Sequence, residues 1–223
     1  QKAAIHLNIS HQYANWPFTL IYKLPTYVST LSKPRNYQNT RRCDSCLSIQ
    51  NTTYRSRGFE PKLDQILVTP GGNPVIFLAI ACAANPGDEV IIPDPGFPTY
   101  FSAINACGAK SVSVQLHEKN NFELQASDVI NAITEKTKLI IINSPSNPTG
   151  ACMQPQQINL IAEHAKKNNI YLLSDEIYAR LILGDQDFYS PGHLDQCKDN
   201  TIILNGFSKA FAMTGWRLGV AIG

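Results

Sequence analysis

The chain has 223 residues and a mass of 24.6 kDa, and 43% of its residues are hydrophobic while 16% are charged. A chain of this length and composition can bury a sizeable core, which excludes a disulfide-stapled miniprotein and an intrinsically disordered protein. The 19 basic and 17 acidic residues leave a formal charge of +2. They form no basic block, so no nucleic-acid partner is predicted.

Neither a membrane partner nor a metal site is predicted. No apolar run reaches the roughly 20 residues of a transmembrane helix, and the first residues do not have the pattern of a secretory signal. The six cysteines are typical of reduced thiols in a cytoplasmic protein, and a single C-x-x-C pair, Cys43 and Cys46, is too few ligands for zinc. The absence of an initiating Met indicates a processed or partial chain.

Residues 1–57 show no sustained helical or strand period and are left as an unassigned N-terminal segment. From residue 58 to residue 223, short apolar runs alternate with longer amphipathic stretches, which predicts one domain. Strands are expected at 66–68, 90–92, 111–116, 139–142, 170–173, 201–204 and 218–222.

Helices are expected between these strands, at 75–84, 99–107, 127–134 and 155–168. Ser127 is predicted to be the N-cap of the third helix, and Pro155 suits the first turn of the fourth. Alternating strands and helices predict an α/β fold around a mostly parallel sheet. Ligands bind such sheets beyond the carboxyl ends of the strands, so the loops that follow the strands are the candidate sites.

Two of these loops are rich in Gly, Pro and Asn. After the first strand, Gly71 and Gly72 precede Asn73 and a predicted helix, a pattern that fits either a plain turn or a phosphate-binding loop at a helix N-terminus. After the strand at 139–142, the prolines of residues 143–150 indicate a rigid loop from which Asn147 can present its amide to a ligand.

A third loop places Asp175 at the end of a buried strand, with Tyr178 three residues later. A buried carboxylate must be paired or hydrogen-bonded to stay ionised. The pattern therefore indicates either a structural ion pair or a cationic ligand.

The fourth loop carries Lys209 among aromatic and small residues, and Arg217 follows eight residues later. These neighbours differ from those of a surface lysine, and Lys209 is either an ordinary solvated lysine or a partly desolvated one with a lowered pKa, able to supply a neutral amine for an imine. Arg217 has the planar fork that suits a phosphate. Together the four loops offer what pyridoxal phosphate demands, namely an imine-forming amine, an anion for the ring nitrogen and a phosphate clamp.

At this point the chain resembles the fold-type I, class I and II aminotransferases, which depend on pyridoxal 5′-phosphate. The motifs that carry the resemblance are PGDEVIIPDPGFPTY at 86–100, NSPSNPTG at 143–150, SDEIY at 174–178 and GFSKAFAMTGWRLG at 206–219. The resemblance implies a three-layer α/β/α large domain, incomplete here, with the C-terminal small domain outside the chain.

It also implies a role for each matching residue. Lys209 would form the internal aldimine and move the proton at the substrate's Cα, Asp175 would hold the proton of the pyridine nitrogen, and Tyr178 would act with them. The cofactor-binding set implied is Gly72, Asn73, Phe97, Asn147, Asp175, Tyr178, Ser208, Lys209 and Arg217.

The implied reaction moves an amino group between an amino acid and a 2-oxo acid, in amino acid metabolism and biosynthesis. A homodimer is expected for the full-length family member. Two alternatives stay open: a lyase or synthase of the same fold and cofactor, and a truncated cofactor-binding domain without activity.

Overall fold

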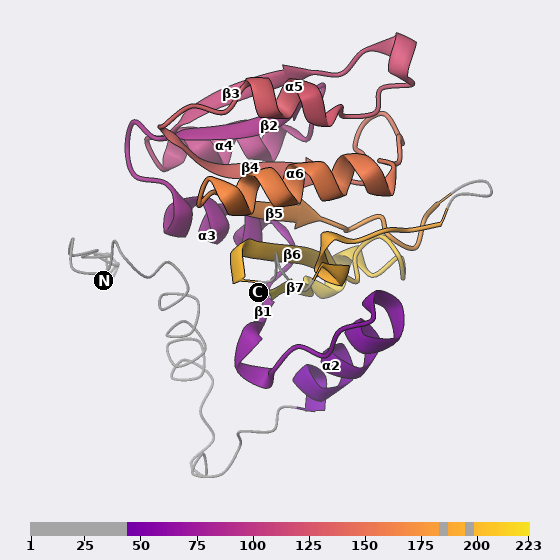
Figure 1. Cartoon of the computed structure of the whole chain (residues 1–223). Coiled ribbons are helices and arrows are strands. Elements are labelled where there is room, and N and C mark those ends of the chain that lie inside the picture. Colours follow the sequence, from indigo (N-terminus) through magenta and orange to yellow (C-terminus); the bar gives the residue numbers. More distant parts are fainter. Residues whose placement is uncertain (1–43, 183–186, 195–198) are drawn as a thin grey trace, which may run out of the picture.

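Seven strands form one sheet in the computed structural model, which describes residues 44–182, 187–194 and 199–223 (Figure 1). The strand order is β1-β7-β6-β5-β4-β2-β3. Every neighbouring pair from β6 to β3 is parallel, whereas β7 is antiparallel to both β6 and β1. The strands are β1 (Ile66–Thr69), β2 (Glu89–Asp94), β3 (Lys110–Gln115), β4 (Thr137–Asn143), β5 (Tyr171–Asp175), β6 (Thr201–Gly206) and β7 (Gly219–Ile222).

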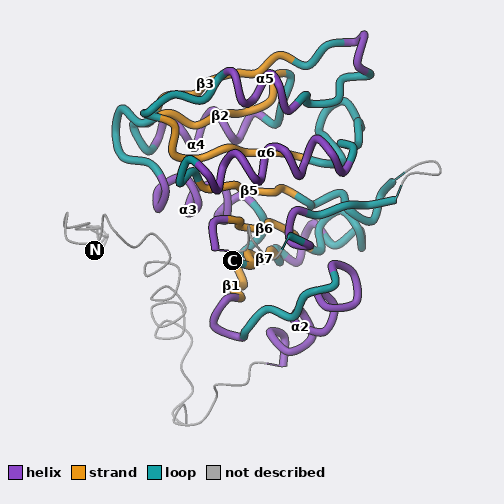
Figure 2. Tube along the Cα trace, in the orientation of Figure 1, coloured by secondary structure: helices purple, strands orange, loops and turns teal. Residues whose placement is uncertain are grey.

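Helices cover both faces of the sheet, which confirms the predicted three-layer α/β/α fold (Figure 2). None of the described helices is long and apolar enough to span a bilayer. The α-helices are α2 (Asp44–Arg57), α3 (Asn73–Ala83), α4 (Pro98–Ala106), α5 (Ala126–Asn131) and α6 (Pro155–Lys167), and short 3₁₀ turns lie at Leu63–Gln65, Glu118–Asn120, Pro191–His193 and Thr214–Trp216.

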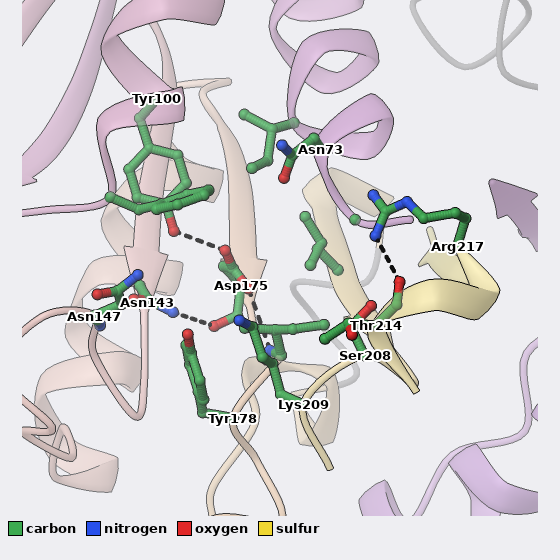
Figure 3. A pocket seen from close by; sticks show the side chains of 15 residues that line it. Asn73, Tyr100, Asn143, Asn147, Asp175, Tyr178, Ser208, Lys209, Thr214 and Arg217 are labelled. Atoms are coloured by element: carbon green, nitrogen blue, oxygen red, sulfur yellow. Dashed lines mark hydrogen bonds between the residues drawn. The ribbon is translucent and has the colours of Figure 1, made fainter. Parts of the chain in front are cut away.

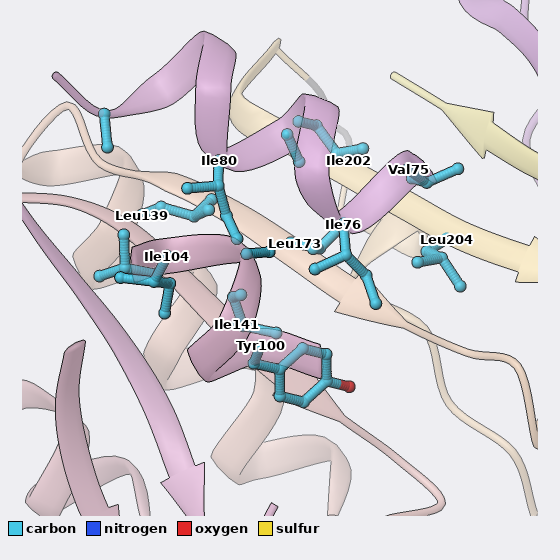
Figure 4. Packing of buried hydrophobic residues seen from close by; sticks show 14 of the residues in the cluster. Val75, Ile76, Ile80, Tyr100, Ile104, Leu139, Ile141, Leu173, Ile202 and Leu204 are labelled. Carbon is cyan, nitrogen blue, oxygen red and sulfur yellow. The ribbon is translucent and has the colours of Figure 1, made fainter. Parts of the chain in front are cut away.

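The two faces of β4 show how alternation builds two cores. Leu139 and Ile141 point to the face covered by α3 and α4, where they pack with Ile76 and Ile104 (Figure 4). Ile140 and Ile142 point to the opposite face and pack against α5 and α6. All four β4 side chains are fully buried, as expected for a central parallel strand covered on both faces.

Helix α2 lies in the segment to which the sequence assigned no structure. Its composition favours helix weakly, because Ser and Thr side chains compete for backbone groups; Thr53 Oγ1 donates to Ile49 O at 2.8 Å in this way. Ile49 packs against a small apolar cluster on β1, β6 and β7. Tertiary packing therefore stabilises α2 more than its own propensity does.

The predicted N-cap at Ser127 is wrong. Helix α5 begins one residue earlier, at Ala126, and its N-cap is Gln125. The Val129 N–H, which an N-cap Ser127 would have accepted, instead donates to the Gln125 carbonyl oxygen at 3.2 Å. The Ala126 N–H at the start of the helix donates to Gln157 Oε1 of α6 at 2.7 Å. The predicted start of α6 with Pro155 in its first turn is confirmed.

Candidate active site

A pocket of about 220 Å³ opens at the carboxyl ends of the strands, between the N-termini of α3 and α4 and the loops after β4, β5 and β6. All nine residues of the predicted cofactor-binding set line this pocket. Figure 3 shows their side chains converging from segments far apart in the sequence. The pocket is also lined by Ile76, Tyr100, Asn143, Ile177, Leu204 and Thr214.

Asp175 is the last residue of β5 and is only 4% exposed. Its Oδ2 accepts a hydrogen bond from the Tyr100 hydroxyl at 2.7 Å, and its Oδ1 accepts one from the Ile177 N–H at 3.2 Å. Both donors are neutral, and none of the ion pairs of the described residues includes Asp175. Of the two expected alternatives, the structural ion pair is therefore not seen, and a cationic ligand is the one left open.

The pKa of the Asp175 carboxyl is raised from 3.8 to about 6. Burial is the main cause and the neighbouring Glu176 charge adds to it, while the Tyr100 and Ile177 hydrogen bonds act in the opposite direction. Burial also raises the pKa of Tyr100 well above its usual range, with a further contribution from Asp175. Tyr100 therefore remains a neutral donor while Asp175 ionises near neutral pH. A cation placed beside Asp175 would lower the pKa of the carboxyl.

The Asn143 side chain ties two of the loops together. Its Nδ2 donates to the Asp175 carbonyl oxygen at 3.0 Å, and its Oδ1 accepts from the Asn147 N–H at 2.7 Å. This amide is buried, so its hydrogen bonds hold the end of β5 at a set distance from the loop after β4.

A close approach between two loops builds the opposite end of the pocket. Gly71 has a φ of +93°, and a Cβ placed there would lie 2.3 Å from Nη2 of Arg217. This backbone conformation favours glycine, and any larger residue would push the Arg217 guanidinium out of its place. Arg217 Nη1 donates to the Thr214 carbonyl oxygen at 3.0 Å, which holds the guanidinium beside Asn73 at the start of α3 (Figure 3).

Lys209 lies on the rim of the pocket, with Nζ 5.9 Å from the centre of the Tyr178 ring. Of the two expected alternatives, the partly desolvated lysine is wrong, because Lys209 is exposed. It follows β6 on a loop at the carboxyl ends of the parallel strands. The aromatic residues that flank it stack on each other, with the ring centres of Phe207 and Phe211 5.4 Å apart.

Two aromatic residues at the start of α4 line the pocket on the side of that helix. Phe97, the N-cap residue of α4, packs edge-on against Tyr100 with ring centres 5.7 Å apart and an interplanar angle of 86°. Tyr100 thereby turns its hydroxyl to Asp175 while Phe97 lines the cavity.

Sequence reasoning missed Tyr100, Asn143 and Thr214. Tyr100 and Asn143 lie inside the motifs at 86–100 and 143–150 but received no role. Their contacts join α4 and β4 to β5 across 75 and 32 residues, and no local pattern signals such pairs. A Tyr in the first turn of a helix that follows a buried strand was the one available hint.

Comparison with known proteins gives a consistent result. The family model for aminotransferase class I and II matches residues 47–223. A putative aminotransferase of Bacillus subtilis, YugH, is 46% identical over 158 residues, which are 71% of this chain and 41% of the relative. An aspartate aminotransferase of Streptomyces avermitilis is 40% identical over 177 residues, which are 79% of this chain and 43% of the relative. The chain thus spans less than half the length of these curated relatives.

The fold is also that of solved structures. The aromatic aminotransferase from Pyrococcus horikoshii superposes with a TM-score of 0.79 at 32% identity, covering 92% of this chain and 55% of that chain.

Proposed function

This chain belongs to the aminotransferase class I and II family, and from that premise we propose that its pocket binds pyridoxal 5′-phosphate and that the full protein transfers an amino group between an amino acid and a 2-oxo acid. Residues 58–223 would form most of the cofactor-binding domain. The observation that carries the proposal is Asp175, a buried carboxylate that receives only neutral donors and lines the pocket.

The side chains present fit this cofactor. Pyridoxal phosphate, when bound, supplies an electron-withdrawing ring that stabilises negative charge on the substrate's Cα. The carboxylate of Asp175 would hold the proton on the ring nitrogen, because a cation there is the partner that the carboxylate lacks. Phe97 would pack on the ring, and Asn147 and Tyr178 would donate to the ring oxygen.

The phosphate end fits as well. The Arg217 guanidinium and the N–H groups at the start of α3, at Gly72 and Asn73, would bind an anion through charge and helix dipole. Ser208 lines the same pocket and could add a hydroxyl donor. The Arg217 guanidinium lies in the space beside Gly71 that the side chain of a larger residue would occupy.

Lys209 would be the catalytic base. Its Nζ supplies a primary amine for carbonyl chemistry and, when free, takes the proton from the substrate's Cα and returns it. Its exposed position on the rim leaves it accessible from solvent.

The proposal extends to assembly and compartment. A homodimer is supported by the family and by large aromatic side chains on the surface, since Trp216 is 75% exposed and Phe211 48% exposed. A cytoplasmic location is supported by the free thiols of Cys82, Cys107 and Cys152. Cys43 and Cys197 lie outside the described residues.

The test is a visible-absorbance titration with pyridoxal phosphate, followed by borohydride reduction and peptide mapping. The wild type should gain a new band and carry the reduced cofactor on Lys209. Lys136→Ala, which removes an exposed lysine at the other end of the sheet, should behave like the wild type, and Lys209→Ala should show neither band nor label. Labelling that is equal in all three proteins would refute the site.

The reaction class is tested with the loaded protein. An aminotransferase passes the amino group of a donor amino acid to an added 2-oxo acid, which is measured as the new amino acid. A lyase instead releases ammonia and a 2-oxo acid without any acceptor. Release without an acceptor would keep the cofactor site and overturn the aminotransferase assignment.

A further inference from the structure

A second buried carboxylate directly follows Asp175. Glu176 is 1% exposed, and both of its oxygens are engaged. Its Oε2 lies 2.6 Å from both Nε and Nη2 of Arg57, and its Oε1 accepts from Ser190 Oγ at 2.5 Å and from Ser174 Oγ at 3.1 Å. Two consecutive buried carboxylates thus have very different partners, because only Glu176 has a cation.

Arg57 comes from far away in the chain. It is the last residue of α2, 119 residues before Glu176, and it is 5% exposed. Its guanidinium carbon lies 5.4 Å from the centre of the Phe188 ring. Apolar residues of similar volume can replace a buried ion pair at little cost, so stability alone is a weak reason to bury this one.

The pair is also tied to the backbone that carries the pocket residues. The Glu176 N–H donates to Leu204 O on β6 at 2.8 Å, and the Glu176 carbonyl accepts from the Ala179 N–H at 3.0 Å. The Glu176 backbone therefore anchors the turn that joins Asp175 to Tyr178, both of which line the pocket.

We propose that Arg57 is a positioning residue for the cofactor site, which acts through Glu176: its charge balances Glu176, so that Asp175 can ionise as the one unpaired anion of the pocket. This inference rests on the proposed function. The Glu176 charge raises the pKa of Asp175 even with Arg57 in place, and without Arg57 that charge would act on Asp175 with no cation to offset it. Asp175 would then be a weaker partner for a cationic ring nitrogen.

The other charged or titratable groups around Asp175 do not replace Arg57. Tyr100 of α4 is a neutral donor, and Tyr178 is a phenol in the same turn as Glu176. Lys209 and Arg217, on the segment between β6 and β7, line the pocket without an ion pair to Asp175. The α3 residues that line the pocket, Asn73 and Ile76, carry no charge.

The test is a ¹³C NMR titration of the carboxyl groups without pyridoxal phosphate, with the Asp175 signal assigned by Asp175→Asn. In Arg57→Met, we expect the Asp175 midpoint to move up, by as much as about one pH unit. In Glu176→Gln, the Asp175 midpoint should fall below its wild-type value. Adding Arg57→Met to Glu176→Gln should then leave that midpoint unchanged, because Arg57 acts through Glu176.

A merely structural role predicts the opposite sign. If Arg57 only packs α2 against the sheet, its loss admits water, and the Asp175 midpoint falls towards that of an ordinary Asp. A fall in Arg57→Met, or no fall in Glu176→Gln, would overturn the proposal. Should Arg57→Met not fold, Glu176→Gln and the double variant still decide it.

The outcome is separable from that of the proposed function. The titrations need no cofactor, whereas the absorbance titration of the wild type tests cofactor binding. A wild type that binds no pyridoxal phosphate would refute the proposed function and would leave the charge balance between Arg57 and Glu176 as measured.

Discussion

A buried carboxylate lies at each end of the parallel strands, Glu89 at the start of β2 and Asp175 at the end of β5. Glu89 accepts from the Thr134 hydroxyl at 2.6 Å and pairs with Lys110 at 3.4 Å. The Thr134 hydrogen bond and the Lys110 charge lower the pKa of Glu89 despite its burial, whereas burial raises the pKa of Asp175 to about 6.

The difference sets a structural end of the sheet apart from the end where we propose the functional site. At the amino end, the chain supplies the partners of its own carboxylate, so ionised Glu89 stabilises the fold. At the carboxyl end, the chain leaves Asp175 without a cation, and its ionisation costs stability that a ligand can return. An ionisable group that is retained in a pocket although its ionisation destabilises the fold indicates a functional site.

The largest expected effect is that of Asp175→Asn on the free energy of unfolding. An acid whose pKa is raised by folding binds its proton more tightly in the folded state, so its stabilising effect is full below pH 3.8 and is lost as the pH rises through about 6. Removing this acid should therefore increase the free energy of unfolding of the protein without cofactor by about 3 kcal/mol at pH 7. Urea unfolding at several pH values measures it, and an equal gain at pH 3.5 would contradict the explanation.

The next largest effects, on stability and on cofactor affinity, are expected from alanine substitutions of two glycines at the two ends of the sheet. Gly71 and Gly87 have φ values of +93° and +89°, but only at Gly71 would a Cβ meet another group, Arg217. Alanine at either position should cost about 1–2 kcal/mol of stability through backbone strain. Only Gly71→Ala should also weaken binding of pyridoxal phosphate, by about tenfold.

Fluorescence titration with the cofactor and urea unfolding measure these two effects. Equal affinities in Gly71→Ala and Gly87→Ala would show that the Arg217 contact does not shape the phosphate end.

A smaller effect of the opposite sign to that of Asp175→Asn is expected for Glu89→Gln. This substitution removes a charge-assisted hydrogen bond and should lower the free energy of unfolding by about 1 kcal/mol at pH 7. Because folding lowers the pKa of Glu89, its stabilising effect is present above pH 4.5 and is lost as the pH falls. Unfolding curves at pH 7 and at pH 3 measure the change. If Glu89→Gln also altered the cofactor affinity, the amino end of the sheet would not be purely structural.

The smallest effect is that of Tyr100→Phe, which removes one donor to Asp175 and leaves the ring packing in place. The pKa of Asp175 should rise, since the Tyr100 hydrogen bond lowers it. Cofactor affinity should fall by about threefold, which corresponds to one modest hydrogen bond. Carboxyl NMR and the absorbance titration measure both quantities, and an unchanged Asp175 midpoint would exclude Tyr100 from setting its charge.

Sequence reasoning worked where one physical rule covers many residues. The runs at 139–142 and 201–204 are apolar and rich in Ile, and they form β4 and β6. The carboxyl ends of parallel strands meet at one edge, so residues such as Asn147 and Asp175 could be expected at one pocket before any contact was known.

Features that depend on tertiary contacts could not be predicted from the sequence. Arg57 comes from a weakly helical segment whose role follows only from its contact with Glu176. The exposure of Lys209 depends on where its loop leaves the sheet, which its apolar neighbours do not reveal. The predicted N-cap of α5 is wrong because the helix begins earlier, where Gln157 from another helix accepts from the Ala126 N–H.

Strand β7 has a consequence for the order of folding. It enters the sheet between β1 and β6, where Val220 aligns with Val68 on one side and Asn205 on the other. The segment with Lys209 and Arg217 connects β6 to β7. Both of its ends are held in the sheet only after β7 has paired with β1, a strand about 150 residues earlier in the chain. Such long-range closure is slow compared with local helix formation. Cofactor capture should therefore coincide with completion of the sheet, and pyridoxal phosphate fluorescence during refolding would time the last strand's arrival.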